Sequence, residues 1–244
     1  MSHEHDHTPG VPDATKSKRN PILIVVMGVA GTGKTTLALA LQARLGMPYI
    51  EGDALHPPEN IAKMSAGTPL TDTDREPWLK LIRTTAERLV FPPSPSHSDP
   101  DRQYPDAPGV LATCSALRGY YRDILRGTHV PPGLPVDMNG NGDDGSGTAN
   151  GNGNGNEARG GSLPAYFVYI KGERAVIWER ISAREGHYMK PGMLDSQIAA
   201  LESPEGEEGV VVVPLEASTE QQADIAIREL NKLLPEPLEP LFKA

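Results

Sequence analysis

The chain has 244 residues and carries 23 basic against 32 acidic side chains, a formal net charge of −9. This acidic balance disfavours a general nucleic-acid or anionic-membrane surface, and no apolar stretch approaches the roughly 20 residues of a membrane span. A single cysteine excludes an internal disulfide and is typical of a reducing compartment. We therefore expect a cytoplasmic protein without nucleic-acid or membrane partners.

Two segments have compositions that do not suit a packed core. The first 20 residues are polar, and residues 138–162 consist almost entirely of Gly, Asn, Asp and Ser. Such segments cannot bury enough apolar surface to offset the entropy of ordering them. The sequence predicts a disordered tail over 1–20 and one α/β domain over 21–244, with low-complexity insertions at about 92–108 and 128–162.

A glycine-rich segment, GVAGTGKTT at 28–36, follows an apolar run and precedes a helical pattern of leucines. This order predicts strand, turn and helix, with backbone N–H groups converging on phosphate oxygens at the helix N-terminus. Lys34 would reach the β- and γ-phosphates, and the Thr35 hydroxyl would bind Mg²⁺. The predicted nucleotide-binding residues are Gly28, Val29, Ala30, Gly31, Thr32, Gly33, Lys34, Thr35 and Thr36.

A second apolar run, at 47–50, predicts a strand that returns to the same edge of the sheet. Asp53 then lies beside the γ-phosphate, where a carboxylate could accept a proton from an attacking hydroxyl or orient it. The alternative role for Asp53 is a turn or a helix cap. His56 follows in a proline-rich turn, and its residue type alone leaves a ligand contact and a passive role equally open.

A helix is predicted after Leu70, capped by Thr73 or Asp74, with Glu76 completing a capping box and Pro77 in the first turn. Arg75 in this cap region could hold an anionic substrate, or it could pair with Asp72. The interpretation of Arg75 stays open on these residues alone.

The next strand is predicted at 110–114, followed by a helix from Ser115. Arg118 and Arg122 are four residues apart, so on one helix they would share a face and present two guanidinium groups to an anion. The alternative is a solvated basic stripe.

The segment 165–170 is the most strand-like run in the chain, and a helix over about 173–184 follows it. Arg180 and Arg184 would then lie one turn apart, next to a segment at 186–192 that could close over the site and exclude water. The alternative is an ordinary connection whose arginines pair with nearby acids. A last strand at 210–213 and a helix over 219–234 complete a parallel sheet with helices on both faces.

The motifs along the chain resemble those of the gluconate kinase family of small P-loop kinases. They are GVAGTGKTT at 28, EGDALHPPENIAKM at 51, PLTDTDREPWL at 69, CSALRGYYRDILR at 114 and REGHYMKPGMLDSQIAALESP at 184. The P-loop alone marks a vast superfamily, whereas the second and third motifs are specific. The resemblance covers most of 22 to about 233, apart from the two insertions.

This resemblance implies a P-loop kinase fold like that of nucleoside monophosphate kinases, with a small flap, and it is compatible with a homodimer. It implies transfer of the γ-phosphoryl group of Mg-ATP to the 6-hydroxyl of D-gluconate. Asp53 would position or deprotonate that hydroxyl. The sugar acid would be gathered by His56, Arg75, Arg122 and His187, and charge on the transferring group would be offset by Lys34, Arg180 and Arg184.

The chain departs from the family pattern at Arg118, where a lysine is common, so a substrate role for Arg118 is not implied. Two other functions share some of the motifs. A shikimate or nucleoside monophosphate kinase would keep the P-loop and the flap arginines but not the DALHP and DREPWL segments. A nucleotide-switched binding module of the GTPase kind would require an Asn-Lys-x-Asp motif, which is absent from the sequence.

Overall fold

The computed structural model describes residues 20–91, 107–129, 163–183 and 191–241. Within these ranges, five strands form one parallel sheet in the order β2-β3-β1-β4-β5. The strands are β1 (Ile22–Met27), β2 (Tyr49–Glu51), β3 (Gly109–Thr113), β4 (Ala165–Lys171) and β5 (Val210–Pro214). The parallel sheet confirms the predicted α/β fold class.

The central strand β1 is apolar on both sides because both faces of the sheet are covered. All six of its residues are buried. Ile22, Ile24 and Val26 point into one hydrophobic cluster, whereas Leu23, Val25 and Met27 point into the other. This strict alternation places a core on each face, as expected for a parallel sheet between two layers of helices.

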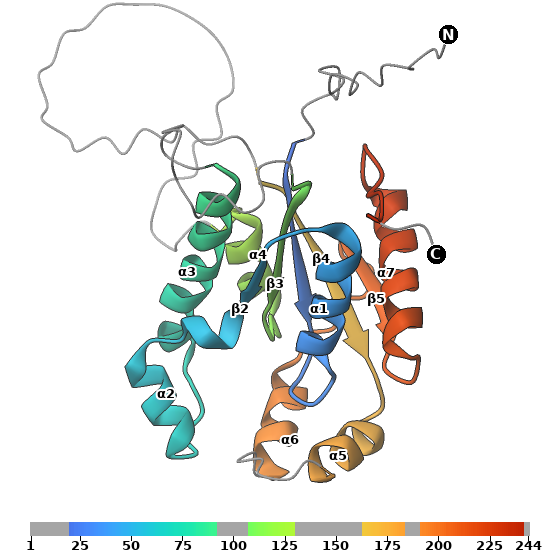
Figure 1. Ribbon diagram of the computed structural model, residues 1–244. Coiled ribbons are helices and arrows are strands. Elements are labelled where there is room, and N and C mark those ends of the chain that lie inside the picture. Colours follow the sequence, from blue (N-terminus) through green and yellow to red (C-terminus); the bar gives the residue numbers. More distant parts are fainter. Residues whose placement is uncertain (1–19, 92–106, 130–162, 184–190, 242–244) are drawn as a thin grey trace, which may run out of the picture.

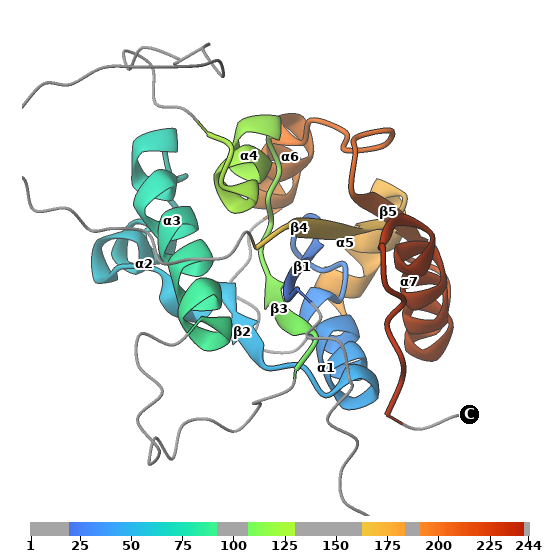
Figure 2. The same ribbon diagram turned by 90° about the horizontal axis from the view of Figure 1, so that it is seen from above.

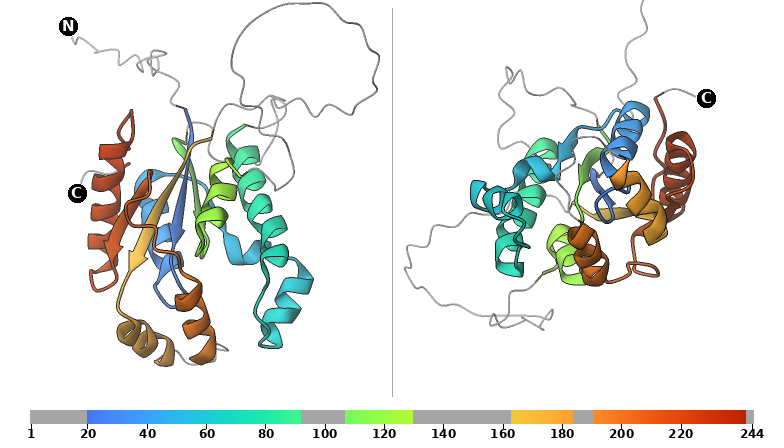
Figure 3. Two further views of the ribbon diagram at one scale, coloured as in Figure 1. Left: turned by 180° about the vertical axis from the view of Figure 1, so that it is seen from behind. Right: turned by 90° about the horizontal axis from the view of Figure 1, so that it is seen from below.

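Two pairs of helices form those layers (Figure 1; Figure 2). On one face lie α1 (Lys34–Leu45) and α7 (Thr219–Leu233), and on the other lie α3 (Asp72–Val90) and α4 (Gly119–Arg126). Seen from behind, α7 and α3 flank the sheet at opposite ends (Figure 3). The two faces therefore bury separate sets of apolar side chains.

The remaining helical elements lie near the carboxyl end of the strands (Figure 1). They are the 3₁₀ helix η1 (Gly52–Leu55), α2 (Pro58–Ser65), α5 (Arg174–Ser182) and α6 (Pro191–Ala200). Ligands of open α/β sheets bind at this end. The extra elements thus surround the edge at which the P-loop lies.

Two helix starts differ from those expected, and one helix is additional. Helix α3 begins earlier, because the Thr71 hydroxyl caps it, accepting from the Asp74 N–H at 3.3 Å, while Asp74 Oδ2 accepts from the Thr71 N–H at 2.9 Å. Pro77 consequently lies inside the helix. Helix α4 begins at Gly119 rather than at Ser115, and α6 was not predicted.

The helices α3 and α4 run back toward the amino end of the sheet, where β3 and β4 begin (Figure 1). The described ranges that end at 91 and 129, and those that begin at 107 and 163, therefore have these ends at the amino end of the sheet. The predicted tail and most of each predicted insertion lie outside the described residues. No helix among the described residues is long and apolar enough to cross a membrane.

Candidate active site

The P-loop has a backbone conformation that favours glycine at three positions. Gly28, Gly31 and Gly33 have φ of 144°, 82° and 89°. A Cβ on Gly31 would lie 2.4 Å from Cγ1 of Ile181 on α5, so the loop and α5 are in close contact. Helix α1 starts directly after the loop, at Lys34. Its unpaired N–H groups and the positive end of its dipole thus form an anion site.

The Lys34 side chain folds back over the loop. Its Nζ donates to the Val29 carbonyl oxygen at 3.1 Å. Burial lowers the pKa of Lys34 below its ordinary value, although the negative charge of Asp53 acts in the opposite direction. Burial disfavours the charged form of this ammonium group, and a negatively charged phosphate bound beside it would stabilise that form.

Glu51, the last residue of β2, accepts hydrogen bonds from three hydroxyl groups. Thr35 Oγ1 and Tyr49 OH donate to its Oε2 at 2.9 Å and 2.5 Å, and Thr113 Oγ1 donates to its Oε1 at 2.5 Å. Partial burial raises the pKa of Glu51, but these hydrogen bonds outweigh it and leave the pKa lowered. Burial and the Glu51 contact raise the pKa of Tyr49 to about 12, so Tyr49 stays a neutral donor.

No role was predicted for Glu51 from the sequence. The signal that could have found it is its place at a strand end, two residues before Asp53, where the P-loop threonine returns to the sheet edge. Hydroxyl and carboxylate oxygens are the ligands that Mg²⁺ prefers. The Thr35–Glu51 pair therefore supplies oxygen atoms of the kind that bind Mg²⁺ at the P-loop edge of the sheet.

Asp53 lies exposed in η1, just beyond β2. Among the described residues, none donates a hydrogen bond to its carboxylate. Its charge nevertheless acts on the pKa values of Lys34, His56 and Cys114, so these three groups lie within range of its electrostatic field. Burial raises the pKa of the Cys114 thiol to about 12, which keeps this cysteine neutral.

Close packing holds the turn that carries Asp53. A Cβ on Gly52 would lie 1.9 Å from the Thr113 carbonyl oxygen, and the Gly52 carbonyl accepts from Trp78 Nε1 at 2.7 Å. The His56 ring stacks on Trp78 with 4.0 Å between ring centroids. Burial lowers the pKa of His56; the Asp53 charge opposes this shift and the Arg75 charge adds to it. A neutral imidazole thus lies next to the Asp53 turn.

Arg75 is the partly exposed arginine of the α3 first turn. Its guanidinium carbon lies 5.9 Å from the Tyr121 ring centroid. The alternative expected from the sequence, pairing with Asp72, is wrong: Asp72 binds Arg118 Nη1 at 2.7 Å and the Tyr121 hydroxyl at 2.5 Å. No carboxylate of the described residues forms an ion pair with Arg75, which keeps its charge available to a ligand.

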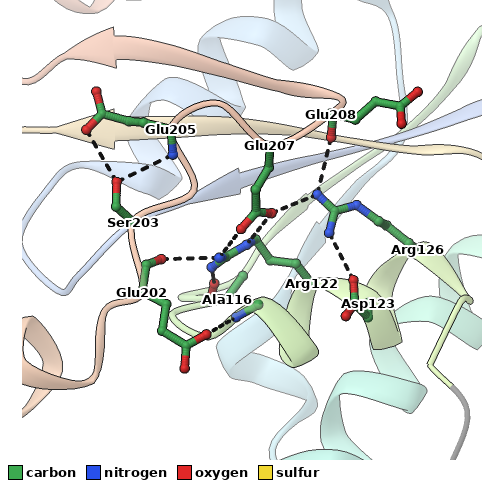
Figure 4. A network of polar contacts seen from close by, with 10 residues as sticks. Ala116, Arg122, Asp123, Arg126, Glu202, Ser203, Glu205, Glu207 and Glu208 are labelled. Atoms are coloured by element: carbon green, nitrogen blue, oxygen red, sulfur yellow. Dashed lines mark hydrogen bonds and ion pairs between the residues drawn. The ribbon is translucent and has the colours of Figure 1, made fainter.

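Arg122 does not lie where a substrate-gathering arginine was expected (Figure 4). Its side chain is fully buried. Nε and Nη2 donate to the two carboxylate oxygens of Glu207 at 2.9 Å and 2.5 Å, and Nη1 donates to the Ala116 carbonyl oxygen at 2.8 Å. Because α4 begins at Gly119, Arg118 stands at the N-cap position, where its side chain binds Asp72 and does not form the predicted arginine pair with Arg122.

Of the two arginines expected near the flap, Arg180 is among the described residues and Arg184 is not. Arg180 on α5 is exposed, and its Nη2 donates to the Leu215 carbonyl oxygen at 2.9 Å. Arg184 and His187 lie outside the described residues. The described site therefore comprises the P-loop with Lys34, the Thr35–Glu51 pair, Asp53, His56 and Arg75.

Comparisons with known proteins agree on one family. The chain is 38% identical over 216 residues to the gluconokinase of Gluconobacter oxydans (strain 621H), covering 88% of this chain and 93% of that protein. It is 34% identical over 219 residues to the probable gluconokinase of Schizosaccharomyces pombe, covering 89% and 92% of the two chains. No protein-family model matches the chain.

A solved structure supports the same relationship. The crystal structure of a gluconokinase from Sinorhizobium meliloti 1021 superposes with a TM-score of 0.61 and 36% sequence identity. The match covers 88% of this chain and 94% of that one. The two proteins therefore share their fold over nearly the full length of the relative.

Proposed function

Since the chain belongs to the gluconokinase family, we propose that it transfers the γ-phosphoryl group of ATP to the 6-hydroxyl of D-gluconate, giving 6-phosphogluconate and ADP. One observation in the structure carries this proposal. Lys34, at the start of α1, and the Asp53 carboxylate, just beyond β2 and without a hydrogen-bond donor among the described residues, lie at the same edge of the sheet. A phosphate-binding cation beside a general base is what phosphoryl transfer to an alcohol requires.

The nucleotide half of the site consists of residues 28–36. Backbone N–H groups of the loop and of the first turn of α1 would hold the phosphates, with Lys34 on the β- and γ-phosphates. Thr35 and Glu51 fit Mg²⁺, since hydroxyl and carboxylate oxygens approach each other there at 2.9 Å. When bound, this ion neutralises charge on the transferring phosphoryl group.

The acceptor half of the site lies on η1 and the first turn of α3. Asp53 would accept the proton of the attacking hydroxyl, or orient that hydroxyl, because no described residue occupies its carboxylate. Arg75 would hold the carboxylate of the sugar acid, and His56, neutral and fixed by its stacking on Trp78, would hydrogen-bond a hydroxyl. A substrate that lacks the carboxylate or the matching hydroxyl would leave these hydrogen-bond donors unpaired. The site would therefore discriminate against such substrates.

The three arginines Arg122, Arg180 and Arg184 do not all have a role in this proposal. Arg122 is not included, because its guanidinium is buried against Glu207 and Ala116. Arg180 and Arg184 would offset charge on the transferring group, with Arg180 on a helix that touches the P-loop. His187 remains an expectation from the resemblance.

The test is ADP formation from Mg-ATP with D-gluconate, run beside shikimate, AMP and no acceptor. Gluconate-dependent turnover at least a hundredfold above the other three reactions would support both the reaction and the acceptor. Equal slow hydrolysis in all four reactions would overturn the acceptor while leaving nucleotide binding intact. Phosphorus NMR of the product then identifies the phosphorylated hydroxyl.

A further inference from the structure

A side chain from α6 binds the main chain of the P-loop. The Ala30 N–H donates to Oε1 of Gln197 at 2.7 Å, although the two residues are 167 positions apart. The contact joins the helix next to the predicted flap to the loop expected to hold the phosphates. The function proposed above assigns no role to Gln197.

The position of Gln197 is fixed by the residues around it on α6. Leu194, one turn earlier, is fully buried, and Ile198 and Leu201 pack against the hydrophobic core. Just after the helix, the Glu202 N–H donates to the Leu117 carbonyl at 2.8 Å, and Glu202 Oε2 accepts from the Gly119 N–H at 2.6 Å. Both ends of this stretch are therefore anchored, and Gln197 is held at the loop.

The chemistry of the carboxamide suits a phosphate site. Its oxygen accepts from the loop, which leaves the two N–H groups of Nε2 as donors. No described residue accepts a hydrogen bond from Nε2. A glutamine can thus fix the loop and still offer a donor to an anion, without adding charge. A glutamate at this position could fix the loop equally well, but its negative charge would repel the phosphates.

We propose that Gln197 is a positioning residue of the nucleotide-phosphate site. It orients the P-loop main chain through Ala30 and presents a neutral, donating group beside the phosphates. This inference rests on the proposed nucleotide-binding function of the loop.

The experiment measures ADP and Mg-ATP affinities by calorimetry for the wild type, Gln197→Leu and Gln197→Glu. Leu removes the acceptor, so both dissociation constants should rise roughly fivefold, as for the loss of one net hydrogen bond. Glu keeps the acceptor but adds a charge, so its loss should be about tenfold or more and larger for ATP than for ADP. Asp195→Asn, on the same helix as Gln197, removes only the exposed ion pair with Arg174 of α5 and should leave both affinities unchanged.

A purely structural role predicts the opposite order, since Glu would restore wild-type affinity after the loss seen with Leu. That result, or wild-type affinities in both variants, would overturn the proposal. Calorimetry is done well below the unfolding midpoint of each variant, and the ATP-to-ADP ratio is unaffected by a change in the folded fraction. Wild-type protein that binds neither nucleotide would instead overturn the proposed function.

Discussion

The hydroxyl of Thr35 donates a 2.9 Å hydrogen bond to Glu51, which links α1, the helix after the P-loop, to the end of β2. Tyr49 and Thr113 bind the same carboxylate. Three neutral donors on one carboxylate keep it ionised and fixed in direction. The acidic group nearest the P-loop threonine is thus held in place before any ion binds.

Glu51→Gln should raise the Mg²⁺ concentration for half-maximal turnover about tenfold, because it removes the negative charge while keeping most of the hydrogen bonds. Tyr49→Phe, which keeps the charge and loses one donor, should change this concentration less than threefold. Titrating Mg²⁺ at fixed ATP measures both effects. An unchanged Mg²⁺ dependence in Glu51→Gln would remove Glu51 from the metal environment.

Asp53→Asn should fold normally and bind ADP within about twofold of wild type, yet lose roughly 10²- to 10⁴-fold in kcat, the range for removing a general base. The surface variant Asp224→Asn, which affects only the ion pair with Arg44, should keep its full turnover. Steady-state kinetics with saturating gluconate separates kcat from KM. Wild-type rates in Asp53→Asn would exclude the base role.

Arg75 and Arg122 should respond in opposite ways to replacement by methionine. Arg75→Met should raise KM for gluconate tenfold or more with little change in stability. Arg122→Met should lower the free energy of unfolding by about 3–5 kcal/mol, since it leaves Glu207 without its main partner, with KM within twofold. Denaturant unfolding and kinetics on each variant check this. A large rise in KM for Arg122→Met without destabilisation would restore Arg122 to the substrate site.

The Glu207 contact should also depend on pH. The hydrogen bond from Arg122 lowers the pKa of Glu207 in the folded protein, although partial burial opposes it. The unfolded chain therefore binds this proton more tightly, and the stabilisation, complete above the ordinary glutamate pKa of about 4.5, is lost as pH falls through the lower folded value. The stability difference between wild type and Glu207→Gln should shrink between pH 7 and pH 3.5. A constant difference would contradict the assignment.

Gly31 and Gly206 form a matched pair for testing the P-loop packing. Both have positive φ, at 82° and 85°, but a Cβ would meet Ile181 only at Gly31 and open space at Gly206. Gly206→Ala should cost about 1 kcal/mol of stability from backbone strain alone. Gly31→Ala should cost more and abolish measurable nucleotide binding. Similar ADP affinity in the two variants would mean that the loop and α5 can move apart.

The sequence predicted the elements that local pattern determines. The five strands and the P-loop helix follow from apolar runs, glycines and helical spacing, and each is found within a few residues of its expected place. The start of α3 was misplaced, because Thr71 and Thr73 are equally good caps by type and only the backbone conformation selects Thr71.

The long-range partners of polar side chains could not be predicted from the local sequence pattern. Arg122 was expected at the site because of its spacing from Arg118 and because of the family resemblance. Its actual partner, Glu207, is 85 residues away. Gln197 likewise contacts a loop at the other end of the chain. Such pairings depend on which helices and strands pack against each other. The spacing of residues within one segment carries no information about that packing.

The described ends of α3 and α4 and the starts of β3 and β4 lie at the amino end of the sheet, opposite the P-loop (Figure 1). Evolution can therefore lengthen the chain there without moving a group that meets the reactants. The same two junctions, after Val90 and after Arg126, offer positions for grafting a reporter or an affinity handle. The groups proposed to meet the reactants and the positions that tolerate a longer chain therefore lie at opposite ends of the sheet.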